Sequence, residues 1–156
     1  MNRSILFAGI LVLLLAAAGC GGAKSDQPSG GGATATSPYD VGPRAGDFPV
    51  EPALASQGEG LFKTKGCTAC HAYGKRMTGP DLRGVTQRRT ADWMEHQILH
   101  PEIMTHEDPI SKQLLATYMV QMSNQGLKPD EAKAVVEYLK KLDEGSLETQ
   151  QAQAQK

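Results

Sequence analysis

The sequence predicts an all-α domain, and three observations carry that prediction. Apolar residues recur at helical spacing in four segments between residues 53 and 144. These segments are bounded by capping residues, prolines and glycines, which commonly mark the ends of helices. No segment alternates apolar and polar residues as a half-buried strand does. We therefore expect helices joined by loops.

The first 19 residues have the layout of a secretory signal peptide. Arg3 precedes an apolar run over residues 5–18, which is shorter than a membrane-spanning helix requires. Small residues follow, and the segment Ala17-Ala18-Gly19-Cys20 resembles a bacterial lipoprotein box, although Leu is commoner at the position of Ala17. The resemblance implies that Cys20 is lipidated and anchors the chain to a membrane. An ordinary signal peptide or an uncleaved anchor are the alternatives.

The rest of the chain divides by composition into three parts. Residues 20–52 contain the anchor cysteine and a segment rich in Gly, Pro and Ser, which has too little apolar surface to fold and predicts a flexible tether. Residues 53–145 form the predicted domain. Residues 146–156, rich in Gln and Ala, are expected to be a disordered tail.

Four helices are expected in the domain. The first ends near Gly66, and a long loop over residues 72–89 follows it. Thr90 caps the second helix, Asp108-Pro109 opens the third and Pro129 opens the fourth. Their inward-facing residues are Leu54, Gly58, Leu61 and Phe62; Trp93, Met94 and Ile98; Ile110, Leu114, Leu115 and Tyr118; and Ala132, Val135, Val136, Leu139 and Leu142.

The segment Cys67-Thr68-Ala69-Cys70-His71 follows the end of the first helix. In a Cys-x-x-Cys-His motif the two thiols form thioethers with the vinyl groups of one haem, and the adjacent imidazole binds the iron. Haem c is attached to exported chains, which agrees with the signal peptide. The motif predicts one covalent haem c, with Cys67 and Cys70 as its attachment points and His71 as an axial iron ligand.

Three alternatives use the same cysteines without haem. A thioredoxin-like dithiol would come with alternating strands and helices, which the sequence does not predict. A zinc site could combine Cys67 and Cys70 with His96 and His100, but the gap between the pairs is long and His71 has no role. A disulfide between Cys67 and Cys70 is the third alternative.

Beyond this motif, residues 53–144 resemble the class I small cytochromes c. Gly58 stands where that family has a helix-crossing glycine, Phe62 where it has a packing aromatic, and Tyr138 in a matching terminal helix. The resemblance implies a small helical domain wrapped around one covalently attached haem. It also implies that the terminal helix crosses the first helix near Gly58.

Gly79-Pro80-Asp81-Leu82 is similar to the Gly-Pro-x-Leu loop of the same family. By this resemblance the carbonyl group of Pro80 accepts a hydrogen bond from His71. Such an outer contact fixes the orientation and tautomer of an iron-binding imidazole.

The resemblance also implies a methionine as the second axial ligand. Met122 begins a segment, residues 122–127, that resembles the Met-Pro-x-x-x-Leu loop ahead of the terminal helix, with Ser123 in place of the proline. Met119 is the second candidate, and Met94 lies on an apolar helix face typical of core residues. Histidine in place of methionine would come from His96, His100 or His106. Methionine–histidine ligation is typical of a relatively high reduction potential.

The charge distribution bears on the partners. A formal net charge of -1 gives no electrostatic case for nucleic-acid binding. Basic residues nevertheless gather in the sequence around the haem motif, and they predict a surface that attracts an acidic redox partner unless they are spread over an ordinary solvated surface. They are Lys63, Lys65, Lys75, Arg76, Arg83, Arg88 and Arg89.

Together these features predict an electron-transfer protein and not an enzyme. The haem domain is expected in the periplasm or on the extracellular face, tethered to a membrane, where it passes one electron between respiratory partners. A haem enzyme or gas sensor with an open iron position is one alternative. A zinc or structural lipoprotein domain without haem is the other.

Overall fold

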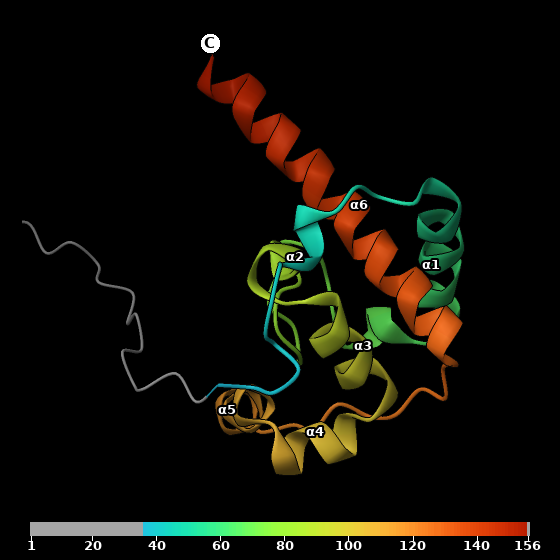
Figure 1. Ribbon diagram of the computed structural model, residues 1–156, viewed down its shortest axis with the longest axis vertical. Helices are drawn as coiled ribbons and strands as arrows, with labels where there is room; N and C mark the ends of the chain where they lie inside the picture. Colours follow the sequence, from blue (N-terminus) through green and yellow to red (C-terminus); the bar gives the residue numbers. More distant parts are fainter. Residues whose placement is uncertain (1–35, 156) are drawn as a thin grey trace, which may run out of the picture. The chain divides into compact units, whose positions relative to one another are not determined.

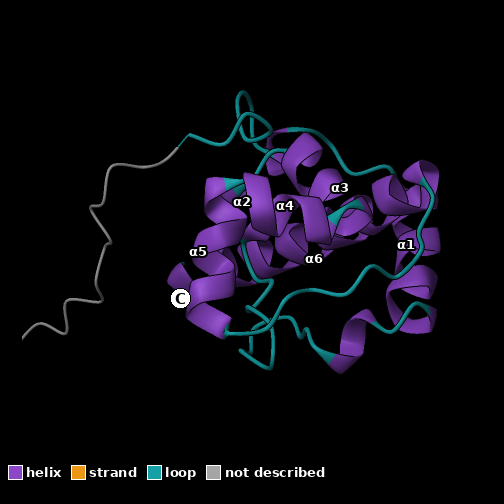
Figure 2. Cartoon of the chain, turned by 90° about the horizontal axis from the view of Figure 1, so that it is seen from below, coloured by secondary structure: helices purple, strands orange, loops and turns teal. Residues whose placement is uncertain are grey.

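The computed structural model describes residues 36–155, so the predicted signal peptide, Cys20 and the first part of the predicted tether lie outside the described residues. Every regular element in this range is helical, which confirms the all-α prediction (Figure 1, Figure 2). The elements are η1 (Ala45–Asp47), α1 (Pro52–Thr64), η2 (Cys67–Ala69), α2 (Val85–Arg88), α3 (Ala91–Leu99), α4 (Pro101–Glu107), α5 (Pro109–Tyr118) and α6 (Pro129–Ala154). Over these residues no helix has the length and apolar character needed to cross a membrane.

The helix starts follow from local hydrogen bonding. The Thr90 hydroxyl accepts from the backbone N–H of Trp93, and the Asp108 carboxylate accepts from two N–H groups in the first turn of α5, as the capping residues predicted. Helix α4 was not predicted. Pro101, which comes just after the predicted second helix, occupies the first turn of α4, where proline costs no hydrogen bond. Helix α2 is a short turn inside the predicted long loop.

Helices α1 and α6 pack against each other at Gly58, as the resemblance implied (Figure 1). A Cβ atom at Gly58 would lie 1.9 Å from the carbonyl oxygen of Ala134, so only glycine allows this approach. Ala55 and Ala134 are fully buried beside it, and the rings of Phe62 and Tyr138 lie 5.5 Å apart. The core continues from this contact to α3 and α4; its buried members are Ala45, Phe62, Trp93, Met94, Met104, Val135, Val136 and Leu139.

Residues 37–51 pack on the domain, and we call them the N-terminal strap. The structure differs here from the prediction of a flexible tether over residues 20–52, because this segment is held by specific contacts. Asp40 accepts a 2.8 Å hydrogen bond from the Thr90 backbone N–H and forms ion pairs with Arg44 and Arg89, and Tyr39 stacks on His96 with ring centroids 4.1 Å apart. These contacts are mainly polar, which is why a criterion based on apolar content missed them.

The end of the strap is held by a buried ion pair on α6. The ammonium group of Lys140 lies 2.8 Å from Glu137 Oε1 and donates to the carbonyl of Pro49 at 2.7 Å, while the backbone N–H of Glu51 donates to Glu137 Oε2 at 2.8 Å. Both side chains of the pair are less than 10% exposed. Each charge therefore has a charged partner and a backbone partner, as buried charges require.

Helix α6 continues through Gly145 to Ala154, where the sequence predicted a disordered tail over residues 146–156. Figure 1 shows these last turns extending beyond the other helices. Their Gln, Glu and Ala residues are good helix formers, and the segment needs no packing partner to continue the preceding helix.

Gly58→Ala tests the α1–α6 contact. The added methyl group meets the Ala134 backbone, and we expect the free energy of unfolding to fall by about 1–3 kcal/mol. Gly60→Ala, on the same helix, is the matched control, because a Cβ at Gly60 meets nothing within 4 Å. We expect this control to gain about 0.5–1 kcal/mol from helix propensity. Denaturant unfolding followed by circular dichroism measures both; equal effects would contradict the crossing.

Lys140→Met tests the buried pair that holds the strap. The substitution leaves the Glu137 carboxylate buried without its cation, and we expect a loss of about 3–5 kcal/mol in the free energy of unfolding. Combining it with Glu137→Gln should recover much of that loss, because no buried charge remains. The exposed Lys141 provides the control, Lys141→Met, which should change stability little. A Lys140→Met effect no larger than this control would be inconsistent with the pair.

Candidate functional site

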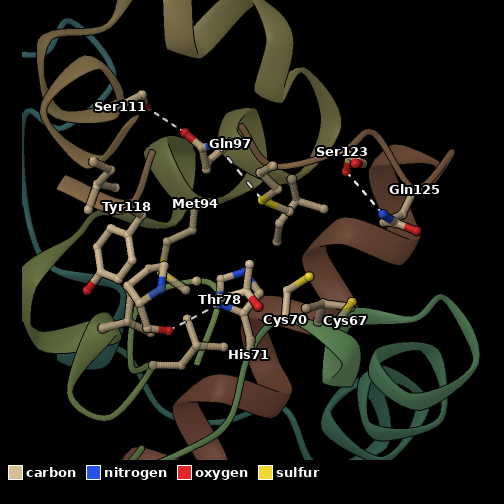
Figure 3. Close-up of a pocket in the computed structure, with 18 of the residues that line it drawn as sticks. Cys67, Cys70, His71, Thr78, Met94, Gln97, Ser111, Tyr118, Ser123 and Gln125 are labelled. Carbon is tan, nitrogen blue, oxygen red and sulfur yellow. Dashed lines mark hydrogen bonds between the residues drawn. The ribbon is translucent and has the colours of Figure 1, made fainter. Parts of the chain in front are cut away.

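A cavity of about 270 Å³ lies inside the helical domain. Its lining is mainly apolar and comes from every part of the fold after the strap: Phe62 of α1, the Cys67–His71 segment, α3, α5, the segment after α5, and Leu139 of α6. Polar atoms make up the smaller part of its surface, which is typical of cofactor sites. Figure 3 shows Cys67, Cys70 and His71 on one side of this space and Gln97 and Ser111 across from them.

The backbone after α1 brings both cysteines to the cavity. Gly66 adopts a left-handed conformation (φ 77°), which ends the helix and turns the chain into the short η2 helix. The N–H of His71 then donates to the Cys67 carbonyl at 2.9 Å. Both cysteines are free thiols in the structure, in contrast to the disulfide alternative. Burial raises the pKa of the half-buried Cys67 thiol, which is therefore protonated at neutral pH.

His71 lies in the orientation that the Pro80 resemblance implied. Its Nδ1 is 3.1 Å from the Pro80 carbonyl oxygen. We assign the proton to Nδ1, because a carbonyl oxygen only accepts, and Nε2 then keeps a free lone pair. Burial lowers the pKa of His71, and the Pro80 hydrogen bond offsets this only in part, so the ring is neutral at pH 7. A neutral imidazole with a free nitrogen is the form that binds a metal.

Gly79 makes this arrangement possible. A Cβ atom there would lie 2.5 Å from His71 Cε1, and the Gly79 N–H donates to the Cys70 carbonyl at 2.9 Å. The loop therefore folds back directly against the imidazole.

Asp143, which no sequence pattern singled out, anchors the rest of this loop. Its buried carboxylate accepts from the Tyr73 hydroxyl at 2.7 Å, the Gly84 N–H at 2.6 Å, and both the N–H and hydroxyl of Thr86 at 3.1 and 2.6 Å. The available signal was an acidic residue next to Leu142 and one turn after Leu139, on the inner face of α6. The carboxylate ties both ends of the loop that carries Pro80 to α6.

The structure separates the axial-ligand candidates. Met122 and the core residue Met94 line the cavity. Met122 Sδ lies 3.9 Å from Gln97 Nε2. Met119 is the left-handed C-cap of α5 and is 80% exposed, outside the cavity lining. His96, His100 and His106 also lie outside that lining, and His96 is stacked on Tyr39 instead.

Two thiols, a neutral imidazole and a thioether thus face one apolar cavity, a donor set that fits haem c. The zinc alternative is not supported in the part of the chain that the structure describes, where no three His, Cys, Asp or Glu side chains gather closely enough to hold a metal ion. Cys67 and Cys70 do not meet His96 and His100 there.

The chain matches the family model for cytochrome c over residues 55–143. Cytochrome c-551 of Stutzerimonas stutzeri is 46% identical over 43 residues, which are 28% of this chain and 41% of that protein. Cytochrome c-551 of Azotobacter vinelandii is 52% identical over 31 residues, 20% of this chain and 38% of that protein. The chain thus spans about two fifths of the length of these curated relatives.

A solved structure gives a longer match. The cytochrome c from Rhodothermus marinus is 40% identical, and the match covers 62% of this chain and 83% of that chain with a TM-score of 0.60. The family match covers more than half of the sequence and includes the Cys67–His71 motif, Pro80 and Met122. Membership implies a covalently attached haem c with its iron. The chain belongs to the cytochrome c family, whose members are electron carriers.

Proposed function

We propose that this protein carries single electrons on one haem c that is attached through Cys67 and Cys70 and ligated by His71 and Met122. The observation that carries the proposal is the shared cavity: both thiols, the Pro80-oriented imidazole and the Met122 thioether line it. When bound, haem supplies the one-electron redox couple. Two protein ligands leave the iron no open position for a substrate, which favours a carrier over an enzyme or sensor.

The residues of the chain have separate parts in this function. Pro80 keeps the Nδ1 proton of His71 in place, so that Nε2 is available to the iron throughout a redox cycle. The apolar lining keeps water from the site and limits the rearrangement that a change of charge would cause. A thioether from Met122 is a weak donor, and the pair that it forms with histidine favours a relatively high reduction potential.

A tethered location is the second part of the proposal. The signal-like segment, the lipoprotein box at Cys20 and the family's haem chemistry together support a haem domain outside the cytoplasm, held to a membrane by a lipidated Cys20 and exchanging electrons with respiratory partners. Because the N-terminal strap is docked on the domain, fewer residues remain for the tether than the composition indicated.

A docking surface for an acidic redox partner is the third part. Lys75 and Arg88 are exposed, and Arg88 lines the edge of the cavity. Val120 is 50% exposed at the same cavity and supplies apolar contact area. Arg89 is excluded from this surface, because it pairs with Asp40 and lies over the Trp93 ring. We expect the positive charges of Lys75 and Arg88 to attract a negatively charged partner and to speed its association.

Axial ligation is tested by the optical spectrum of the full chain, produced in a host that matures c-type haem. We expect a low-spin spectrum with the ferric thioether–iron charge-transfer band. Met122→Ala should lose the band, because the ligand is removed, and Met119→Ala should keep it, because that side chain points to solvent. A high-spin wild-type spectrum that readily accepts added ligands would favour a sensor or enzyme. A colourless protein would contradict haem binding.

Electrostatic steering is tested by stopped-flow oxidation with hexacyanoferrate(III), a small anionic oxidant. Lys75→Gln/Arg88→Gln should slow the second-order rate by up to about tenfold at low ionic strength, and the difference should shrink as salt screens the charges. Lys63 is no part of this surface, because it pairs with Glu59 at 2.7 Å beside Lys141. Lys63→Gln/Lys141→Gln therefore removes the same charge on the α1–α6 side of the domain and should have a smaller effect. Equal rates for the two double variants at every salt concentration would rule out a local docking surface.

A further inference from the structure

Three polar side chains form a connected row that ends at Met122. The Ser111 hydroxyl lies 2.5 Å from Gln97 Oε1, and Gln97 Nε2 lies 3.9 Å from Met122 Sδ (Figure 3). Behind them, Ser111 Oγ is 3.2 Å from Asp108 Oδ1. Gln97 and Ser111 line the same cavity as Met122, where most other side chains are apolar. These polar side chains interrupt a mainly apolar cavity wall. Each of them has to be hydrogen-bonded there, because a buried polar group without a partner is costly.

Asp108 is a fixed end for this row. Its side chain is fully buried, and Oδ1 accepts from the Trp93 indole N–H at 3.0 Å and from the Ile110 and Ser111 N–H groups at 3.0 and 2.9 Å. These bonds tie α3 to the start of α5 and hold Ser111 in place. Because Asp108 Oδ1 already accepts three N–H hydrogen bonds, the hydroxyl proton of Ser111 is available for a hydrogen bond to Gln97.

The orientation of the Gln97 amide follows from its two neighbours. A thioether sulfur is only an acceptor, so the NH₂ group of Gln97 suits Met122 and the carbonyl oxygen suits the Ser111 hydroxyl. The reversed amide would place its oxygen against the sulfur, with two acceptors facing each other. Ser111 would then have to give its proton to Asp108. The shorter contact to Gln97, 2.5 Å against 3.2 Å, favours the first arrangement.

The segment that carries Met122 also needs support from outside. Ser123 follows the methionine where the related loops have a stiffening proline. Helix α3 contacts this segment at two points: Gln97 reaches Met122 Sδ, and the Leu99 carbonyl accepts from Asn124 Nδ2 at 2.9 Å. Only the first contact involves the sulfur, so the two can be separated by mutation.

We propose that Gln97 is a positioning residue for the axial ligand Met122, donating an N–H to its sulfur and held in that orientation by Ser111. The inference rests on the proposed function, since it requires Met122 to bind the iron. A thioether has two lone pairs: one binds iron, and the other accepts the N–H. The hydrogen bond draws electron density from the sulfur and so weakens the bond from Met122 to the iron. The weakening is greater in the ferric state, in which the iron draws more electron density from its ligands. Gln97 therefore favours the reduced protein and raises the reduction potential.

The test is the reduction potential of the full-length haem protein, measured by spectroelectrochemistry, together with the thioether–iron charge-transfer band. Gln97→Leu, which keeps the side-chain volume, should retain the band. It should lower the equilibrium constant for reduction by up to about tenfold, a fall of up to about 59 mV for one electron. Ser111→Ala, which frees the amide, should shift the potential in the same direction by less and serves as a second variant should Gln97→Leu fold poorly.

Asn124→Ala is the matched control, because it removes the other α3 contact and leaves the sulfur untouched. It should lower stability without moving the potential. A Gln97→Leu potential equal to the wild type, or a shift that Asn124→Ala reproduces, would overturn the inference while Met122 ligation stands. If the wild-type protein lacks the charge-transfer band, the ligation itself fails, and the role of Gln97 fails with it.

Discussion

The close contact between α1 and α6 at Gly58 is the constraint on which the rest of the domain depends. The two backbones are in direct contact there, because a Cβ atom at Gly58 would clash with the Ala134 carbonyl. This contact fixes the distance between the two helices. The end of α1 then determines where the two thiols and His71 lie. Further along α6, Asp143 holds the loop that places Pro80 against the imidazole. One helix thus supports both the segment that carries His71 and the loop that orients it.

Much of this arrangement could be predicted from local sequence. Thr90 and Asp108 cap their helices through bonds within one turn, and Gly58 lies on a regular apolar stripe. The Cys67–His71 motif is contiguous, so its chemistry can be recognised without a fold. Pro101 was ambiguous, because proline both follows helices and opens them, and here it opens α4.

The elements that sequence analysis missed depend on contacts between distant residues. Asp143 is one acidic residue among several in its helix, and only the fold brings Tyr73, Gly84 and Thr86 to it. Gln97 resembles any polar residue of α3 until Met122 and Ser111 are placed beside it. The strap is a similar case, because its hydrogen bonds with backbone groups join it to residues 44 to 91 positions away.

The strap also determines how a mechanical load would enter the domain. A pull on the chain ahead of Ser37 meets Asp40, Arg44 and Arg89 first, where hydrogen bonds and ion pairs are loaded together. The next contact to be loaded is the partly buried hydrogen bond from Lys140 to the Pro49 carbonyl. Both sets of contacts come before α1 and the Cys67–His71 segment in the chain. We therefore expect α3 and α6 to carry the tension, while the Cys67–His71 segment is not loaded.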